Sequence, residues 1–204
     1  MSYIEAFDYA ILRFMYNLEL KLSFLKDFAR FISFFGDKGL FFIAITLTLL
    51  MYKETREEGT IVALSILISA IITNLLLKNL VARARPFTHD ELKGYWQFAG
   101  AVMENSYSFP SGHTTISSAF SFAVLLTMKT KKRYLFLFVP FLMGISRMML
   151  FVHYPTDVIG GLLVGLLGSF LALTAYYGLK KLSLFKKFIY TDLYMIPVNM
   201  EGVK

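Results

Sequence analysis

Four long apolar segments constrain the fold of this chain more than any other feature of its sequence. They cover Thr60–Leu77, Thr114–Met128, Tyr134–Val152 and Val158–Leu179. An α-helix needs roughly 20 mainly apolar residues to cross the hydrocarbon core of a bilayer. Only 17% of the residues are charged, whereas about a quarter are charged in a typical soluble domain. The sequence therefore predicts an all-α fold, a polytopic membrane helical bundle.

A fifth apolar stretch, Leu40–Tyr52, is shorter and needs residues before Gly39, a tilt or a thinned bilayer to cross the membrane. The segment Tyr3–Phe35 mixes apolar and charged residues. This mixture predicts an amphipathic interfacial helix or pair of helices, with a sixth span left open. Asp37 is the expected N-cap of the helix after the intervening turn. We expect five or six transmembrane helices in one domain, residues 1–204, with an amphipathic segment 1–35, a motif-bearing core 36–179 and a basic tail 180–204.

Basic residues gather in three segments that the predicted spans place on one side of the membrane. They are Lys53 and Arg56, then Lys129, Lys131, Lys132 and Arg133, then Lys180, Lys181, Lys186 and Lys187. Such segments mark the cytoplasmic side, which explains the net charge of +7 without a nucleic acid partner. The loop from about Val81 to Pro110 and the turn His153–Asp157 then face the extracytoplasmic side of the cell membrane.

Polar residues at the extracytoplasmic ends of these helices suit a bound phosphate. Charges near hydrocarbon are costly and usually face an interior or aqueous cavity. Two basic residues seven apart, or two helical turns, would share one helical face, and a helix N-terminus favours anions. An arginine on another helix would clamp the same group. The candidate phosphate-binding residues are Lys78, Arg85, Ser111, Gly112 and Arg147.

Two histidines on separate helices suggest two different catalytic roles in phosphoryl transfer. Asp157 follows His153 by four residues, so its carboxylate would orient the imidazole of a nucleophile. His113 is then free to act as the general acid. Arg83 is open to two interpretations, an interfacial anchor or a charge that supports the site. The chain contains no cysteine, and two histidines with one aspartate make a poor binuclear metal centre, so we expect metal-free chemistry without a cofactor.

Together these residues resemble the type 2 phosphatidic acid phosphatase superfamily, which also includes the vanadium haloperoxidases. The chain matches the three family motifs in order: Lys78 to Arg85-Pro86, then Pro110-Ser111-Gly112-His113, then Ser146-Arg147 to His153 and Asp157. The resemblance implies that His153 is the nucleophile, Asp157 orients it, His113 is the acid, and the five candidates above bind phosphate. The several hydrophobic spans argue against a haloperoxidase, whose known examples are typically soluble.

The resemblance also implies a phosphorylated membrane lipid as substrate. Small bacterial members act on undecaprenyl diphosphate, phosphatidylglycerophosphate, phosphatidate or lipid A phosphates, and the motifs do not separate these. We favour undecaprenyl diphosphate, because an outward-facing site suits cell-envelope lipid recycling. A non-catalytic membrane protein that transports or binds anions or lipids is the alternative from another class. The oligomeric state is not defined by the sequence.

Overall fold

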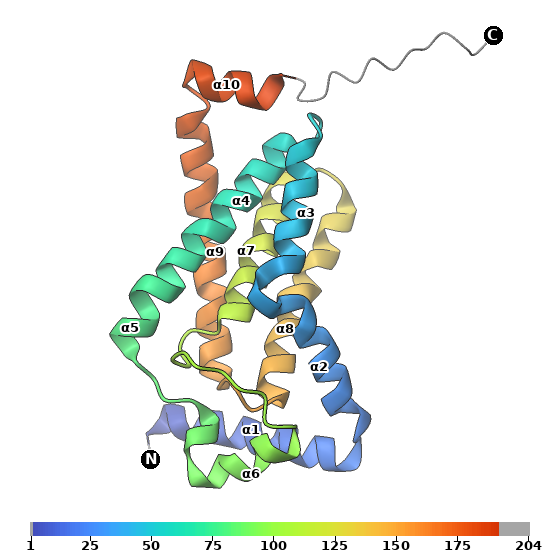
Figure 1. The fold of residues 1–204 in the computed structure, drawn as a ribbon, viewed down its shortest axis with the longest axis vertical. Helices are drawn as coiled ribbons and strands as arrows, with labels where there is room; N and C mark the ends of the chain where they lie inside the picture. The colour runs from blue at the N-terminus through green and yellow to red at the C-terminus, as the bar shows by residue number, and fades with distance from the viewer. Residues whose placement is uncertain (1, 192–204) are drawn as a thin grey trace, which may run out of the picture.

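Three helical runs of the computed structural model, which describes residues 2–191, are long and apolar enough to cross a bilayer. They cover Phe24–Met51, Arg56–Thr88 and Pro155–Leu179. Every regular element among the described residues is helical (Figure 1). The α-helices are α1 (Tyr3–Lys21), α2 (Phe24–Gly36), α3 (Leu40–Met51), α4 (Arg56–Ile71), α5 (Lys78–Val81), α6 (Asp90–Phe98), α7 (Gly112–Thr127), α8 (Phe138–Met149), α9 (Pro155–Leu179) and α10 (Ser183–Tyr190). The predicted all-α membrane helical bundle is confirmed.

The connections between these helices include four short irregular helices. They are η1 (Asp37–Gly39), the π-helix η2 (Ile72–Leu77), η3 (Pro86–Thr88) and η4 (Lys131–Leu137). Through η1, α2 continues into α3, which supplies the length that the apolar stretch Leu40–Tyr52 needed. The expected N-cap role of Asp37 is wrong. Gly39 occupies that position with φ 70°, a left-handed conformation that glycine adopts without a steric penalty.

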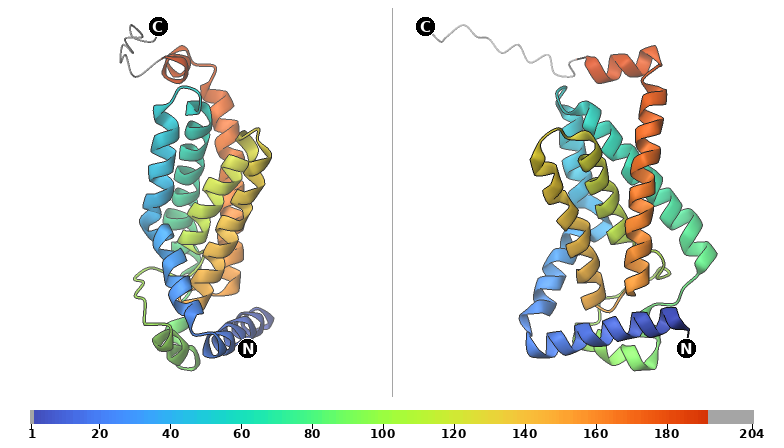
Figure 2. Two further views of the ribbon diagram at one scale, coloured as in Figure 1. Left: turned by 90° about the vertical axis from the view of Figure 1, so that its right-hand side faces the viewer. Right: turned by 180° about the vertical axis from the view of Figure 1, so that it is seen from behind.

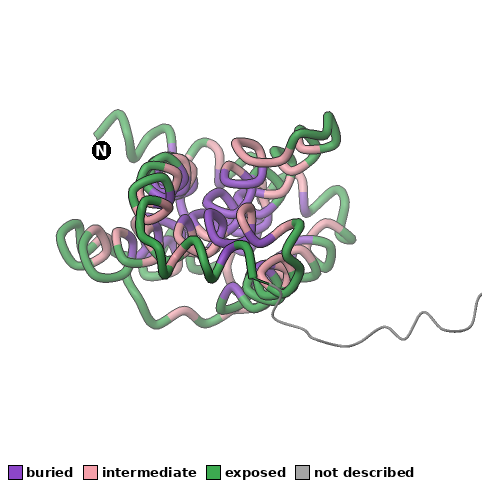
Figure 3. The backbone as a smooth tube through the Cα atoms, turned by 90° about the horizontal axis from the view of Figure 1, so that it is seen from above, coloured by how far each residue is buried: buried purple, intermediate pink, exposed green. Residues whose placement is uncertain are grey.

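Helices α4, α7 and α9 form the centre of the bundle, and small residues bring them close together. The hydroxyls of Ser65 and Ser169 both donate to the carbonyl of Ala119, at 2.9 and 3.1 Å. Such small and hydroxyl-bearing residues are the usual contacts between helices in membranes. Seen from above, the buried residues lie in the middle of the bundle and the exposed ones on its outside (Figure 3).

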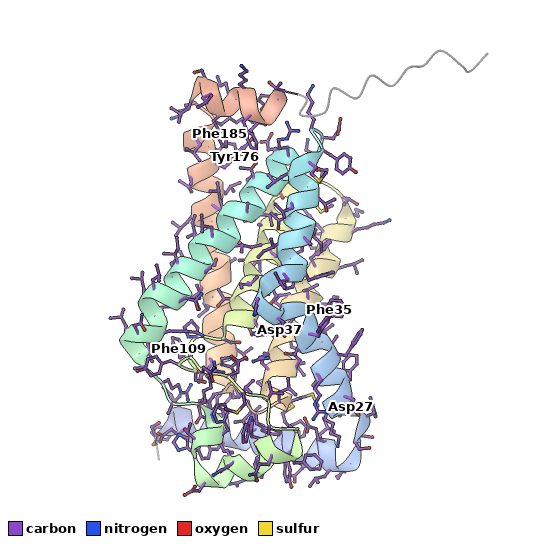
Figure 4. All side chains as sticks on the ribbon, in the orientation of Figure 1. Asp27, Phe35, Asp37, Phe109, Tyr176 and Phe185 are labelled. Atoms are coloured by element: carbon purple, nitrogen blue, oxygen red, sulfur yellow. The ribbon has the colours of Figure 1, made fainter. Side chains whose placement is uncertain are left out.

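The two ends of the bundle are covered by different helices (Figures 1 and 2). At one end α1 and α6 lie across the bundle, joined by stacked rings of Tyr16 and Tyr95 whose centroids are 4.1 Å apart. At the other end α10 lies across it, and there the ring centroids of Tyr176 and Phe185 are 5.7 Å apart (Figure 4). The three basic segments lie at the α10 end, so the helix termini with the predicted site residues meet at the end that α1 and α6 cover.

We predict that Gly165→Ala destabilises the bundle. A Cβ at Gly165 would lie 2.5 Å from Cβ of Ser118 on α7 and 2.6 Å from the nitrogen of Ala119. Overpacking of this kind typically costs about 1–3 kcal/mol. Thermal unfolding in detergent should show a lower midpoint for this variant. Gly178→Ala is the matched control on the same helix, because a Cβ there meets no atom within 4 Å. Equal midpoints for the two variants would contradict the packing described here.

Candidate active site

Polar side chains from five segments converge between the end of the bundle and the layer formed by α1 and α6. They come from α5 and the chain after it, the loop 99–111, the start of α7, the end of α8 and the start of α9. A cavity of about 750 Å³ opens beside them. Its lining includes Lys78, Arg83, Arg85, Glu104 and Ser106.

Two buried arginines from distant segments share one carboxylate. Arg85 and Arg147 are 4% and 1% exposed. The Nη2 atom of Arg85 lies 3.5 Å from Oε2 of Glu104, and Nη2 of Arg147 donates to the other oxygen, Oε1. Burial raises the pKa of Glu104, but the charges of Arg147 and Arg85 outweigh burial and hold that pKa below its ordinary value. An ionised carboxylate therefore spans two guanidinium groups, as two oxygens of a phosphate would.

Lys78 joins this group through Ser106. Its Nζ donates to the Ser106 hydroxyl at 2.7 Å, and Arg85 donates to the Ser106 carbonyl at 2.7 Å and to its hydroxyl at 3.1 Å. The expectation that Lys78 and Arg85 share one helical face is wrong. Helix α5 ends at Val81, and Ala82 has φ 45°, so the chain turns before it reaches Arg85. The two basic residues meet around a loop residue instead.

His153 follows a tight turn at the end of α8. Phe151 in this turn has φ 53°, an unusual conformation for a bulky residue, and its side chain is fully buried. Nε2 of His153 lies 3.3 Å from Nη1 of Arg85, and Nδ1 lies 3.5 Å from Oδ2 of Asp157. Burial lowers the pKa of His153 to about 4, although Asp157 opposes this shift. The imidazole is therefore neutral near pH 7, with one of its two ring nitrogens unprotonated.

Asp157 is held by Arg83 and by two further groups, from Ser108 and Tyr154, that were not predicted to lie at the site. Its Oδ2 accepts from the Ser108 hydroxyl at 2.5 Å and from the Tyr154 N–H at 2.8 Å. Its Oδ1 accepts from Nη1 of Arg83 at 2.7 Å. Of the two interpretations of Arg83, the structure favours the charge that supports the site.

The remaining predicted residues lie at the start of α7. Nε2 of His113 lies 3.5 Å from Oδ1 of Asp37, whose position is labelled in Figure 4. His113 packs so closely on Gly36 that a Cβ there would lie 2.5 Å from its Cδ2. Ser111 is buried and its hydroxyl accepts from Thr114 at 3.0 Å, whereas a Cβ on Gly112 would meet no atom within 4 Å. Open space therefore adjoins the N-terminus of α7.

Glu104 was the main residue missed from the sequence. It is the sole acidic residue between Glu91 and Asp157, in a stretch rich in basic and hydroxyl groups. That isolation was the one available signal, because the loop around it has no helical or strand periodicity. No group of three or more His, Asp or Glu side chains within residues 2–191 is placed to hold a metal ion. The available chemistry is anion binding by guanidinium groups beside a neutral, oriented imidazole.

A helical membrane bundle with such a site defines a phosphoryl-transfer enzyme of the membrane. Residues 58–181 match the family model described as the PAP2 superfamily, and the chain belongs to that superfamily. An undecaprenyl-diphosphatase of Sulfolobus acidocaldarius is 31% identical over 164 residues, which cover 77% of each chain. A lipid A 1-phosphatase of Rhizobium etli is 32% identical over 171 residues, covering 74% of this chain and 70% of that protein.

The fold is also that of a solved structure. LpxE of Aquifex aeolicus aligns with a TM-score of 0.64 at 20% identity, over 82% of this chain and 94% of that one. The protein is a membrane phosphatase of the PAP2 superfamily.

We predict that Glu104→Gln strengthens binding of inorganic phosphate. The carboxylate of Glu104 occupies the space between Arg85 and Arg147, so a phosphate must displace it, and a neutral amide competes less well. Competitive inhibition by phosphate should tighten roughly tenfold, equivalent to about 1.4 kcal/mol. Glu57→Gln is the control, because Glu57 also pairs with a basic residue, Lys180 at 3.1 Å, but at the other end of the bundle. Unchanged or weaker inhibition of the Glu104 variant would contradict this assignment.

Proposed function

We propose that this phosphatase removes a terminal phosphate from a membrane lipid at the extracytoplasmic face, through a phosphohistidine at His153. The observation that carries the proposal is the orientation of that ring. Its Nδ1 faces Asp157 and its Nε2 faces Arg85, one of the two arginines that hold Glu104. Nε2 therefore lies beside the guanidinium group that would hold a phosphate in the place of the Glu104 carboxylate.

In the first step, the substrate phosphate takes the position of Glu104 between Arg85 and Arg147. Nε2 of His153 attacks the phosphorus, and the bond from phosphorus to the leaving oxygen breaks. His113 donates a proton to that oxygen, so the lipid leaves as an alcohol or, from a diphosphate, as a monophosphate. General acid catalysis of this kind contributes roughly 10²–10⁴ in rate.

In the second step, water attacks the phosphohistidine. His113, now deprotonated, accepts a proton from the water, the N–P bond breaks, and inorganic phosphate and a neutral His153 are restored. Asp157 stays ionised throughout and stabilises the positive charge on the imidazole ring, as the aspartate of a serine-protease triad does.

The remaining members of the cradle bind the transferred phosphoryl group. Lys78 adds a compact positive charge beside Arg85, with Ser106 as their common contact. Ser111 and Gly112 lie at the N-terminus of α7, where backbone N–H groups and the helix dipole favour an anion. The open space beside Gly112 would accept a phosphate oxygen.

Undecaprenyl diphosphate is the favoured substrate. An undecaprenyl-diphosphatase matches 77% of this chain, although a lipid A 1-phosphatase matches 74% of it. The basic segments at the α10 end support a multi-pass topology in the cell membrane with that end in the cytoplasm and the site outside. Phosphatidylglycerophosphate, phosphatidate and lipid A phosphates are the alternative substrates.

The test is phosphate release from these purified lipids in detergent, with EDTA present. Wild type should release phosphate, because guanidinium and ammonium groups stabilise the charge that a metal would otherwise hold. His153→Ala and His113→Ala should lose activity while still inserting and unfolding like wild type. The lipid ranking identifies the substrate.

Three outcomes would contradict the proposal. Normal activity of either histidine variant would refute its assigned role. Activity that requires a divalent ion would refute the metal-free mechanism. A wild-type protein that binds these lipids and releases no phosphate would favour the non-catalytic lipid-binding alternative.

A further inference from the structure

Asp8 is a buried charge on a helix outside the family match. That match begins at residue 58, whereas Asp8 lies on α1, which crosses the end of the bundle beside the site. Its side chain is 0% exposed, and the buried residues Asp8, Leu12 and Glu19 occupy one face of α1. A buried carboxylate without partners is costly, so its contacts indicate what it does.

The Asp8 carboxylate binds the start of α9. Its Oδ1 accepts from the Thr156 N–H at 3.0 Å, and its Oδ2 accepts from the Thr156 hydroxyl at 2.7 Å. The first N–H groups of a helix have no partner within the helix. Asp8 therefore caps α9 from another helix, one residue before Asp157.

The same carboxylate also binds Arg83. Nη2 of Arg83 lies 2.6 Å from Oδ2 of Asp8, while Nη1 lies 2.7 Å from Oδ1 of Asp157. The guanidinium thus sits between two carboxylates and lies 3.9 Å from the centre of the Tyr154 ring. One guanidinium and two carboxylates carry a net charge of −1. Without Asp8, Arg83 would fully neutralise Asp157, and the group facing Nδ1 of His153 would have no net charge.

We propose that Asp8 is a positioning residue for the phosphatase reaction, acting through Arg83 and Asp157 on His153. It sets the orientation of Arg83 and leaves Asp157 with the negative charge that stabilises a positive imidazole. This inference rests on the proposed nucleophilic role of His153. Because Asp8 is linked to Asp157 through Arg83 and is not among the residues that line the cavity, it affects kcat and leaves KM nearly unchanged.

The test compares kcat and KM of wild type, Asp8→Asn and the double variant Asp8→Asn/Arg83→Gln. The substrate is the lipid that wild type hydrolyses fastest. Asparagine keeps the shape and an acceptor for Thr156 but removes the charge, so kcat should fall roughly tenfold, as for a pKa change of one unit at His153. The double variant removes both charges and restores a net −1 at Asp157, so its kcat should recover toward wild type.

Glu5→Gln is the matched control, because Glu5 is an exposed acidic residue on the same helix that forms hydrogen bonds with Ser2. It should not change kcat. A purely structural anchor would give further loss in the double variant, and that result would overturn the inference. If Asp8→Asn does not fold, kcat of the folded double variant is compared with that of wild type. A kcat near that of wild type supports the inference, and an inactive protein overturns it. If kcat is unchanged in Asp8→Asn while His153→Ala is inactive, this inference alone is refuted. If His153→Ala is active, the proposed function itself is refuted.

Discussion

Buried positive charge at one end of the bundle is the constraint on which the site depends. Removing a guanidinium from water costs several kcal/mol unless it is well paired. Four basic side chains meet three acidic ones here: Lys78, Arg83, Arg85 and Arg147, with Asp8, Glu104 and Asp157. Counted without the histidines, the group carries a net charge of +1. Arg85 and Arg147 share the single carboxylate of Glu104, and a phosphate dianion in its place would balance them more fully. The pairing thus explains how these charges are tolerated in the folded protein, and it supports the proposed binding of a phosphate in the place of Glu104.

Close packing of small residues holds the two histidines in register. The backbone N–H of Ser111 donates to the carbonyl of Asp157 at 3.0 Å, so the starts of α7 and α9 are bonded directly. Gly161 on α9 permits this approach, since a Cβ there would lie 2.8 Å from the Ser111 carbonyl. The helix packing of the membrane core therefore fixes the distance between the segment that carries His113 and the turn that carries His153.

Hydropathy and motif spacing predicted the helical bundle and the segments that converge on the site. Apolar length predicted two of the three long helical runs, those within Arg56–Thr88 and Pro155–Leu179. Asp157 does face His153, as the four-residue spacing implied. Contacts between remote segments were not predictable, because they follow from how helices cross. Asp8 and Thr156 lie 148 positions apart and meet only because α1 lies across the bundle. The prediction that Lys78 and Arg85 share one helical face was wrong because the chain turns at Ala82. No glycine or proline at that position indicated a turn.

Trapping the reaction intermediate tests the central claim most directly. A lipid substrate labelled on its terminal phosphate would be mixed with enzyme and quenched in alkali within a turnover, because phosphohistidine survives alkali and is lost in acid. Peptide mapping should place the label on His153, and His153→Ala should carry none. Turnover with the label on another residue, or with no labelled protein at any time, would contradict a covalent mechanism through His153.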